Sequence, residues 1–167
     1  MDRIWKMSLL MVGIILADQF SKGAIQSNFN LGESVNVIPG FFNLTYVRNP
    51  GVAFGMGGTL PDWVRIFLFK VIPVGACFWF LWLIWDTRRK SLLQCLAFSM
   101  IFAGAVGNLI DRISMDFVVD MFDFYFKGYH FATFNVADAS ISIAAGIYLL
   151  DYFMEERNKK KENESVV

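Results

Sequence analysis

Four long apolar segments dominate the pattern of hydrophobic and polar positions along the chain. They cover approximately residues 4–25, 63–85, 91–113 and 134–154. A helix rises about 1.5 Å per residue, so roughly 20 apolar residues cross the ~30 Å hydrocarbon core of a bilayer. The pattern therefore predicts an all-α integral membrane protein, with four transmembrane helices forming a single domain over residues 1–157.

The connections between these segments have patterns of their own. In residues 26–62, apolar residues alternate with Thr and Tyr, and turn signals occur at Pro39-Gly40 and Asn49-Pro50-Gly51. This is typical of strands, so we expect a small β-rich subdomain in this first outer loop. It would lie on the membrane surface or, alternatively, act as a lid on the helix ends. The second outer loop, 114–133, holds the strand-like run FVVDMF, and residues 158–167 predict a charged, flexible tail.

Composition and charge support a membrane protein. Hydrophobic residues make up 56% of the chain, and 15 basic residues balance 15 acidic ones. The basic residues form short clusters beside apolar runs instead of a stripe, which argues against a nucleic-acid partner. These clusters lie near the N-terminus, in the TRRK stretch at 87–90 and in the tail. The positive-inside rule then predicts that both termini are cytoplasmic and that the two longer loops lie outside.

The N-terminal segment superficially resembles a signal peptide, because basic residues precede its apolar run. It lacks a small-x-small cleavage site, and Asp18 and Gln19 follow the apolar run directly. We therefore expect a retained first membrane helix.

Metal and thiol chemistry find little support in the sequence. Cys77 and Cys95 fall within apolar segments, where they are expected to pack as small hydrophobic residues. His130 is the only histidine, it is interpreted as a loop residue, and no Cys/His ligand spacing accompanies it. We expect no metal and no organic cofactor.

Carboxylates are the unusual feature of so apolar a chain, and several crowd into residues 107–124. Ionisable groups beside membrane-length segments are costly and mark functional sites by default. The depth of each polar residue in the membrane can be estimated from its position along its predicted helix. By this estimate, polar residues of three predicted helices lie at one level: Asp18, Asn108, Asp111, Arg112, Asn135 and Asp138. Asp120 can reach this level from the second outer loop.

Asp120 and Asp138 are the candidate catalytic pair. Two carboxylates in a low-dielectric site push their pKa values apart, so one is protonated while the other is ionised. Such a pair can activate water and protonate an amide carbonyl. The alternative is that these polar residues only hold helices together.

The other charged residues receive structural interpretations. The alternative of helix–helix hydrogen bonding is favoured for Asp111 and for Asp18 with Lys22, which form an i, i+4 pair. Asp116 and Asp123 are expected to be solvated, with Asp123 as a conceivable support for Asp120. Arg65 and Lys70 are expected to extend toward lipid headgroups. Asp86 and Asp151 are interpreted as ordinary residues at helix ends.

Five motifs give the chain a family resemblance. They are DQFSK (18–22), NPGVAFG (49–55), GNLIDR (107–112), VVDMFDF (118–124) and FNVADASI (134–141). In this order on a four-helix chain, they resemble the bacterial lipoprotein signal peptidases (signal peptidase II). GAVGN (104–108) stands where many relatives have a Gly-Gly-type stretch, and it preserves the small residues that close helix packing needs.

The resemblance implies an aspartic intramembrane endopeptidase of the bacterial cytoplasmic membrane, with its active site toward the extracytoplasmic side. Its substrates would be prolipoproteins carrying diacylglyceryl on a cysteine, cut just before that cysteine. The family's catalytic dyad maps onto Asp120 and Asp138. Substrate-lining roles fall on five other residues: Asn49, Gly51, Asn108, Arg112 and Asn135. Asp18, Lys22 and Asp111 would support the site, membrane lipid would surround it, and globomycin-type inhibitors would occupy it.

Two other functions remain open at this point. A small proton-coupled transporter would relay ions through its acids. It would require acids nearer the membrane centre, broken helices or repeated halves, and the sequence contains none of these patterns. A non-catalytic membrane assembly factor would use the polar residues only to join helices.

Overall fold

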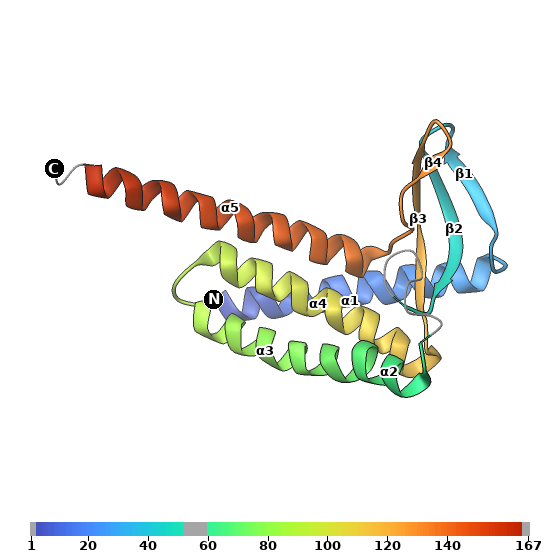
Figure 1. Ribbon diagram of the computed structural model, residues 1–167, viewed down its shortest axis with the longest axis horizontal. Coiled ribbons are helices and arrows are strands. Elements are labelled where there is room, and N and C mark those ends of the chain that lie inside the picture. The colour runs from blue at the N-terminus through green and yellow to red at the C-terminus, as the bar shows by residue number, and fades with distance from the viewer. Residues whose placement is uncertain (1–2, 52–59, 165–167) are drawn as a thin grey trace.

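The computed structural model describes residues 3–51 and 60–164, which form a bundle of long helices with a small sheet at one end (Figure 1). Within these ranges, four helices are long and apolar enough to cross a membrane, as predicted: Arg3–Asn28, Asp62–Thr87, Leu92–Met115 and Val136–Lys160. Each helix begins within a few residues of its predicted first residue.

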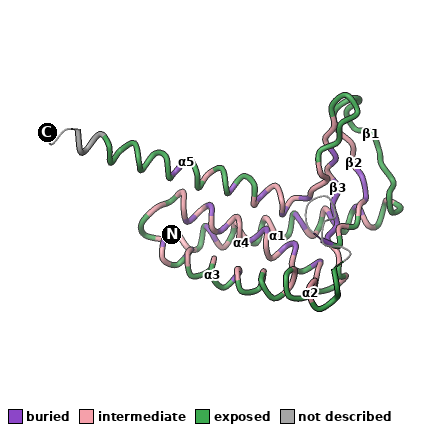
Figure 2. The backbone as a smooth tube through the Cα atoms, in the orientation of Figure 1, coloured by how far each residue is buried: buried purple, intermediate pink, exposed green. Residues whose placement is uncertain are grey.

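The second of these helices is continuous but not uniform. It consists of α2 (Asp62–Ile66), a π-helical stretch η2 (Phe67–Val71) and α3 (Ile72–Thr87). Its large apolar side chains, including Phe78, Trp79 and Trp82, are exposed. A helix that is apolar on this outward surface is suited to contact lipid. Exposed positions run along the outer side of α3 and along much of α5 (Figure 2).

Helix α4 (Leu92–Met115) lies between the other helices and contacts α1 (Arg3–Asn28), α3 and α5 (Val136–Glu164). Ser91 caps its N-terminus by accepting a hydrogen bond from the backbone N–H of Gln94 at 3.2 Å. Asp116 ends it in the left-handed conformation, with φ 65°. Helix α5 continues to Glu164, so residues 158–164 are helical where the sequence predicted a flexible tail; residues 165–167 lie outside the described ranges.

Two glycines allow the helices to approach α4 closely. A Cβ atom at Gly104 would lie 2.5 Å from the backbone oxygen of Ala137 in α5. A Cβ atom at Gly107 would lie 2.6 Å from Oδ2 of Asp18 in α1. Real Cβ contacts are longer than this, so a side chain at 104 would clash with backbone and one at 107 would displace the Asp18 carboxylate. The close packing expected at 104–108 is present.

The sheet combines both connections, which corrects the prediction that it belongs to the first loop alone. Its antiparallel strands lie in the order β1 (Ser34–Ile38), β2 (Phe42–Asn49), β3 (Val118–Phe126) and β4 (Tyr129–His130). Strands β1 and β2 come from the first connection, whereas β3 and β4 come from the second. The register places Val47 opposite Asp120. Pairing of β2 with β3 therefore brings the NPG motif beside the aspartate-rich strand.

The two ends of the bundle differ in character. The sheet stands at one end, while the N-terminus, the α3–α4 connection and the C-terminal end of α5 lie toward the other (Figure 1). The basic clusters recognised in the sequence belong to this second group of segments. The basic clusters and the sheet thus lie at opposite ends of the molecule.

Candidate active site

Asp120 and Asp138 line one cavity of about 740 Å³ between the sheet and the helices. Asp120 lies on β3, and Asp138 lies in the first turn of α5. Asn49, Asn108 and Arg112 line the same cavity. The remaining walls are mostly apolar, including Phe131, Phe134, Ile141 and Ile143. The residues that the sequence placed at one membrane level do meet.

Asp120 is almost completely buried, with 1% of its surface exposed. Its Oδ1 accepts a hydrogen bond from Asn135 Nδ2 at 2.8 Å, and its Oδ2 accepts one from Asn49 Nδ2 at 3.0 Å. Burial raises the pKa of Asp120 to about 6, and the nearby charge of Asp138 adds to this rise. The two asparagine donors act in the opposite direction, because they stabilise the ionised form.

Asp138 is fixed by the start of its own helix. Asn135 precedes α5, and its Oδ1 accepts from the backbone N–H of Asp138 at 2.9 Å. In return, Oδ2 of Asp138 accepts from the backbone N–H of Asn135 at 3.3 Å. This reciprocal arrangement is a capping box, which the N-x-x-D spacing of the sequence makes available. The other oxygen, Oδ1, accepts from Asn108 Nδ2 at 2.8 Å.

Asn135 joins the two carboxylates. It is fully buried, its amide nitrogen reaches Asp120, and its amide oxygen holds the backbone of Asp138. The same nitrogen lies 3.2 Å from Asn108 Oδ1 and 3.2 Å from the backbone oxygen of Val119. Asn135 is therefore one of the side chains that fix the relative position of the two aspartates.

A buried ionic triad lies beneath the pair. Lys22 Nζ lies 2.8 Å from Asp18 Oδ2 and 3.0 Å from Asp111 Oδ2, and it donates to Asn108 Oδ1 at 3.0 Å. All three charged side chains are at most 2% exposed. Buried charges persist when they are paired and hydrogen-bonded, as these are.

Each acid of the triad also holds the backbone beside one member of the pair. Asp18 Oδ1 accepts from the N–H of Ala137, the residue before Asp138, at 2.9 Å. Asp111 Oδ2 accepts from the N–H of Val119, the residue before Asp120, at 3.1 Å. The sequence predicted that these acids support the site. It did not predict that each one accepts a hydrogen bond from the backbone next to one aspartate of the pair.

Arg112 extends from α4 toward the end of β2. Its Nη2 donates to the backbone oxygen of Gly51 at 3.2 Å, and its guanidinium lies 5.8 Å from the centre of the Phe69 ring. Gly51 in turn donates its N–H to Asn49 Oδ1 at 3.1 Å. The rest of the NPGVAFG motif, residues 52–55, lies outside the described residues.

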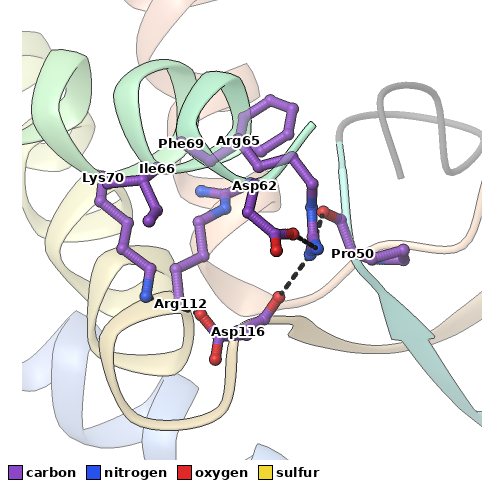
Figure 3. A pocket seen from close by; sticks show the side chains of 8 residues that line it. All are labelled: Pro50, Asp62, Arg65, Ile66, Phe69, Lys70, Arg112 and Asp116. Carbon is purple, nitrogen blue, oxygen red and sulfur yellow. Dashed lines mark hydrogen bonds and ion pairs between the residues drawn. The ribbon is translucent and has the colours of Figure 1, made fainter. Parts of the chain in front are cut away.

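Beside Arg112 is a smaller cavity of about 310 Å³ (Figure 3). Lys70 Nζ lies 2.6 Å from Asp116 Oδ1, and Arg65 Nη2 donates to the backbone oxygen of Asp116 at 3.3 Å. Arg65 and Lys70 thus bind the turn after α4, whereas the sequence predicted that they extend toward headgroups. Their partner is far away in the sequence, so no local pattern reveals it. The hydrogen bond from Lys70 lowers the pKa of Asp116.

Asp123 also differs from its prediction as a solvated loop charge. It is buried on β3, where its Oδ2 accepts from Asn43 Nδ2 at 2.8 Å and its Oδ1 lies 2.8 Å from His130 Nδ1. His130, expected in a loop, belongs to β4. The only sequence signal for this cluster is the short spacing of Asp123 and His130 on either side of the K-G turn. Over the described ranges, no group of three or more His, Cys, Asp or Glu residues is arranged to hold a metal ion.

Comparison with known proteins finds relatives that match nearly the whole chain. The family profile described as "Signal peptidase (SPase) II" matches residues 10–154. The lipoprotein signal peptidase of Shewanella loihica is 43% identical over 98% of both chains. That of Pasteurella multocida is 40% identical over 89% of both chains. A solved structure described as a bacterial membrane enzyme, determined in meso at 2.3 Å resolution, superposes with a TM-score of 0.82. It is 32% identical and covers 93% of this chain and 92% of its own.

Proposed function

This chain belongs to the signal peptidase II family of aspartic peptidases, and on that premise we propose that it cleaves diacylglyceryl-modified prolipoproteins just before the lipidated cysteine, with Asp120 and Asp138 as its catalytic pair. Membership supports the removal of signal peptides from prolipoproteins. One observation carries the finer assignment: two carboxylates line a single cavity and are joined through the buried amide of Asn135.

The proposed chemistry needs one ionised and one protonated carboxyl group. The ionised group takes a proton from water as the water oxygen attacks the scissile carbonyl carbon, and the protonated group donates to the carbonyl oxygen. When the tetrahedral intermediate collapses, the C–N bond breaks and a proton passes to the cysteine nitrogen. The products are a signal peptide with a new carboxylate and a lipidated cysteine with a free amine.

The surroundings of the pair suit this substrate. The apolar walls formed by Phe134, Ile141 and Ile143 can accommodate the signal peptide or the acyl chains, while Asn49, Asn108 and Arg112 offer donors to the peptide backbone. Gly51 presents its carbonyl to Arg112, which keeps that guanidinium at the cavity wall. A globomycin-type inhibitor would compete for the same cavity.

The orientation in the membrane follows from charge. The basic clusters lie at the end of the bundle opposite the sheet, and basic residues favour the cytoplasmic side. We place the sheet and the aspartates on the extracytoplasmic side of the bacterial cytoplasmic membrane. A secreted, lipid-anchored substrate would present its scissile bond at this level.

The assignment is tested with Asp120→Asn and Asp138→Asn, each assayed for cleavage of a diacylglyceryl-modified precursor. Each is expected to lose at least about 1,000-fold in kcat, because the pair acts as a unit. The matched control is Asp62→Asn, which removes an equal charge from a side chain that is 92% exposed. Near-normal turnover by either dyad variant would disprove the assignment. Equal cleavage of a precursor without diacylglyceryl would disprove the substrate class.

A further inference from the structure

A cavity of about 520 Å³ lies at the end of the bundle opposite the sheet, where α1 begins and α3 ends. The described residues that line it are Arg3, Ile4, Trp85, Arg88 and Arg89. Three of these five residues are arginines, and none of them is acidic. The cavity therefore gathers positive charge, and it has no part in the chemistry proposed above.

Arg3 brings to this cavity a donor that the protein leaves unused. It is the first residue of α1, and its Nη1 is buried without a hydrogen-bond partner in the part of the chain that the structure describes. Leaving a buried polar group unpaired is costly, more so for a charged one, and such exceptions call for a bound partner. Because the group is a cation, its complementary partner is an anion.

Arg88 is held in place on the other side of the cavity. Its guanidinium carbon lies 3.5 Å from the centre of the Trp85 ring, and its Nη1 donates to the backbone oxygen of Trp85. Contacts of this kind fix a guanidinium on an aromatic face. They use only part of its five N–H donors, so the fixed cation can still bind an anion.

The acid next to Trp85 in the sequence does not neutralise these arginines. Both carboxylate oxygens of Asp86 accept hydrogen bonds from Lys90 Nζ, at 2.7 and 2.8 Å. Within the described ranges, none of the ion pairs involves an arginine of the cavity. The three guanidinium charges are thus available to a ligand.

The surface around the cavity is apolar and suited to lipid. Trp5 and Trp82 are exposed near it in sequence, as is Trp85 on its wall. Tryptophan is enriched at the level of the lipid headgroups, where its ring is partly in lipid and partly in water. A basic cavity at this level, with apolar side chains beside it, matches an amphiphile that carries an anionic headgroup.

We propose that this cavity, here called the arginine cavity, binds the phosphate group of an anionic phospholipid from the membrane leaflet at this end of the bundle. The site is additional to the proposed peptidase function and does not depend on it. The phosphate oxygens accept charge-assisted hydrogen bonds from guanidinium groups of α1 and of the α3–α4 connection. The acyl chains lie along the exposed apolar side chains of the helices.

A phosphate in this place fastens the helices to one another. Ile4, on the cavity wall, packs against a buried cluster of Met7, Ile84 and Cys95, which come from α1, α3 and α4. The lipid headgroup closes the end of the bundle beside this core. Since such a ligand binds the folded protein, it also stabilises it against unfolding.

The test titrates the delipidated full-length protein in dodecyl maltoside with dioleoylphosphatidylglycerol and measures bound lipid by native mass spectrometry. Arg3→Gln and Arg89→Gln are each expected to weaken the apparent affinity at least about fivefold, the contribution of one basic residue to binding an anionic lipid. The matched control is Arg157→Gln, which removes an exposed arginine of α5 outside the cavity and should change the affinity less than about twofold. Equal effects of all three substitutions would overturn the site.

Two further ligands separate a lipid site from a site for any phosphate. Dioleoylphosphatidylcholine has the same phosphate and acyl chains without net charge, and it should bind at least about fivefold more weakly than the anionic lipid. Glycerol 1-phosphate has the charge without the chains, and about a 100-fold excess should not displace the lipid, because it buries no acyl chain. Equal binding of the two lipids, or displacement by glycerol 1-phosphate, would refute the proposal.

A second measurement needs no substitution, so it holds even if Arg3→Gln does not fold. Phosphatidylglycerol with a diazirine in its headgroup should label residues 3–6 or 85–89 of the unsubstituted protein. Labelling confined to other segments would overturn the inference. Cleavage of a lipidated precursor confirms that each variant used in the titration is folded.

Discussion

At the scale of single residues, Asn135 has two separable tasks. Its side chain caps α5 by accepting from the N–H of Asp138, and it donates to Asp120. Asn135→Ser retains an N-cap acceptor but is too short to replace the amide that reaches Asp120. We expect Asn135→Ser to keep the N-cap contact while kcat falls about 100-fold, the usual cost of one donor to a reacting group.

Asn135→Ala provides the matched comparison, because it removes both contacts. It should lose the same activity and, in addition, about 1 kcal/mol of stability from the missing cap. Thermal unfolding in detergent and turnover of a lipidated precursor measure the two effects. Equal stability of the two variants would show that the capping contact is unimportant, and unchanged kcat in both would refute the role in joining the pair.

The pKa of Asp120 predicts a pH-dependent stability. Because burial raises this pKa to about 6, the folded protein retains a proton that the unfolded chain releases at lower pH. The stabilisation from this group is complete below about pH 4, the usual pKa of an aspartate, and is lost as the pH rises through about 6. The Tm of the unsubstituted protein, relative to that of Asp120→Asn, should therefore fall between pH 4 and 7. A difference that is constant with pH, or that rises, would contradict the raised pKa.

At the residue scale, the sequence indicated which carboxylates to examine but did not show their distant partners. The free-energy cost of carboxylates near the membrane drew attention to Asp120 and Asp138. Their assignment as a catalytic pair depended on the family resemblance. Asp123 was expected in solvent because its partner Asn43 lies 80 positions away. A single sequence shows alternation and local spacing, but it does not show which strand a residue will face.

At the scale of elements, the crossing of α1 and α4 helps to position the proposed catalytic pair. Gly107 allows Asp18 to approach α4, and Asp18 holds the N–H of Ala137 beside Asp138. We expect Gly107→Ala to push this carboxylate aside and reduce kcat about 100-fold, since misplacement by about 1 Å can cost this much. Gly75→Ala in α3 is the matched control, because its Cβ would meet no atom within 4 Å. Precursor cleavage measures both, and similar activities would refute a role for this crossing.

The elements themselves were predicted with uneven success. Long apolar runs identified the four helices because few other structures satisfy the backbone inside a bilayer. The sheet was assigned to the first connection alone, because the partner of β2 is the distant strand β3. Helix α5 passes its predicted end at Met154 and includes EERNKKK, whose residues are strong helix formers apart from Asn. Composition indicated a flexible tail there, whereas local helix propensity was the better guide.

At the scale of the whole molecule, the arrangement separates three environments along one axis. Basic clusters occupy one end, helices with exposed apolar side chains the middle, and the sheet with the aspartates the other end. This order explains why a hydrolase can work beside lipid. A cavity of about 610 Å³ over the sheet shares Asp120 with the cavity that holds both aspartates, so it offers water a route to the pair away from the apolar helices.

The orientation in the membrane can be tested with two variants that each carry one cysteine. Both are made in a chain in which Cys77 and Cys95 are replaced by Ala. Tyr129→Cys lies on β4, where the native side chain is 84% exposed, and Lys90→Cys lies in the α3–α4 connection, where it is 67% exposed. Because basic residues favour the cytoplasmic side, a membrane-impermeant maleimide should label Tyr129→Cys in intact spheroplasts and Lys90→Cys only after lysis. Retained precursor cleavage by both variants would serve as the folding control. The reverse labelling pattern would place the aspartates on the cytoplasmic side, where a secreted lipoprotein precursor does not present its cleavage site.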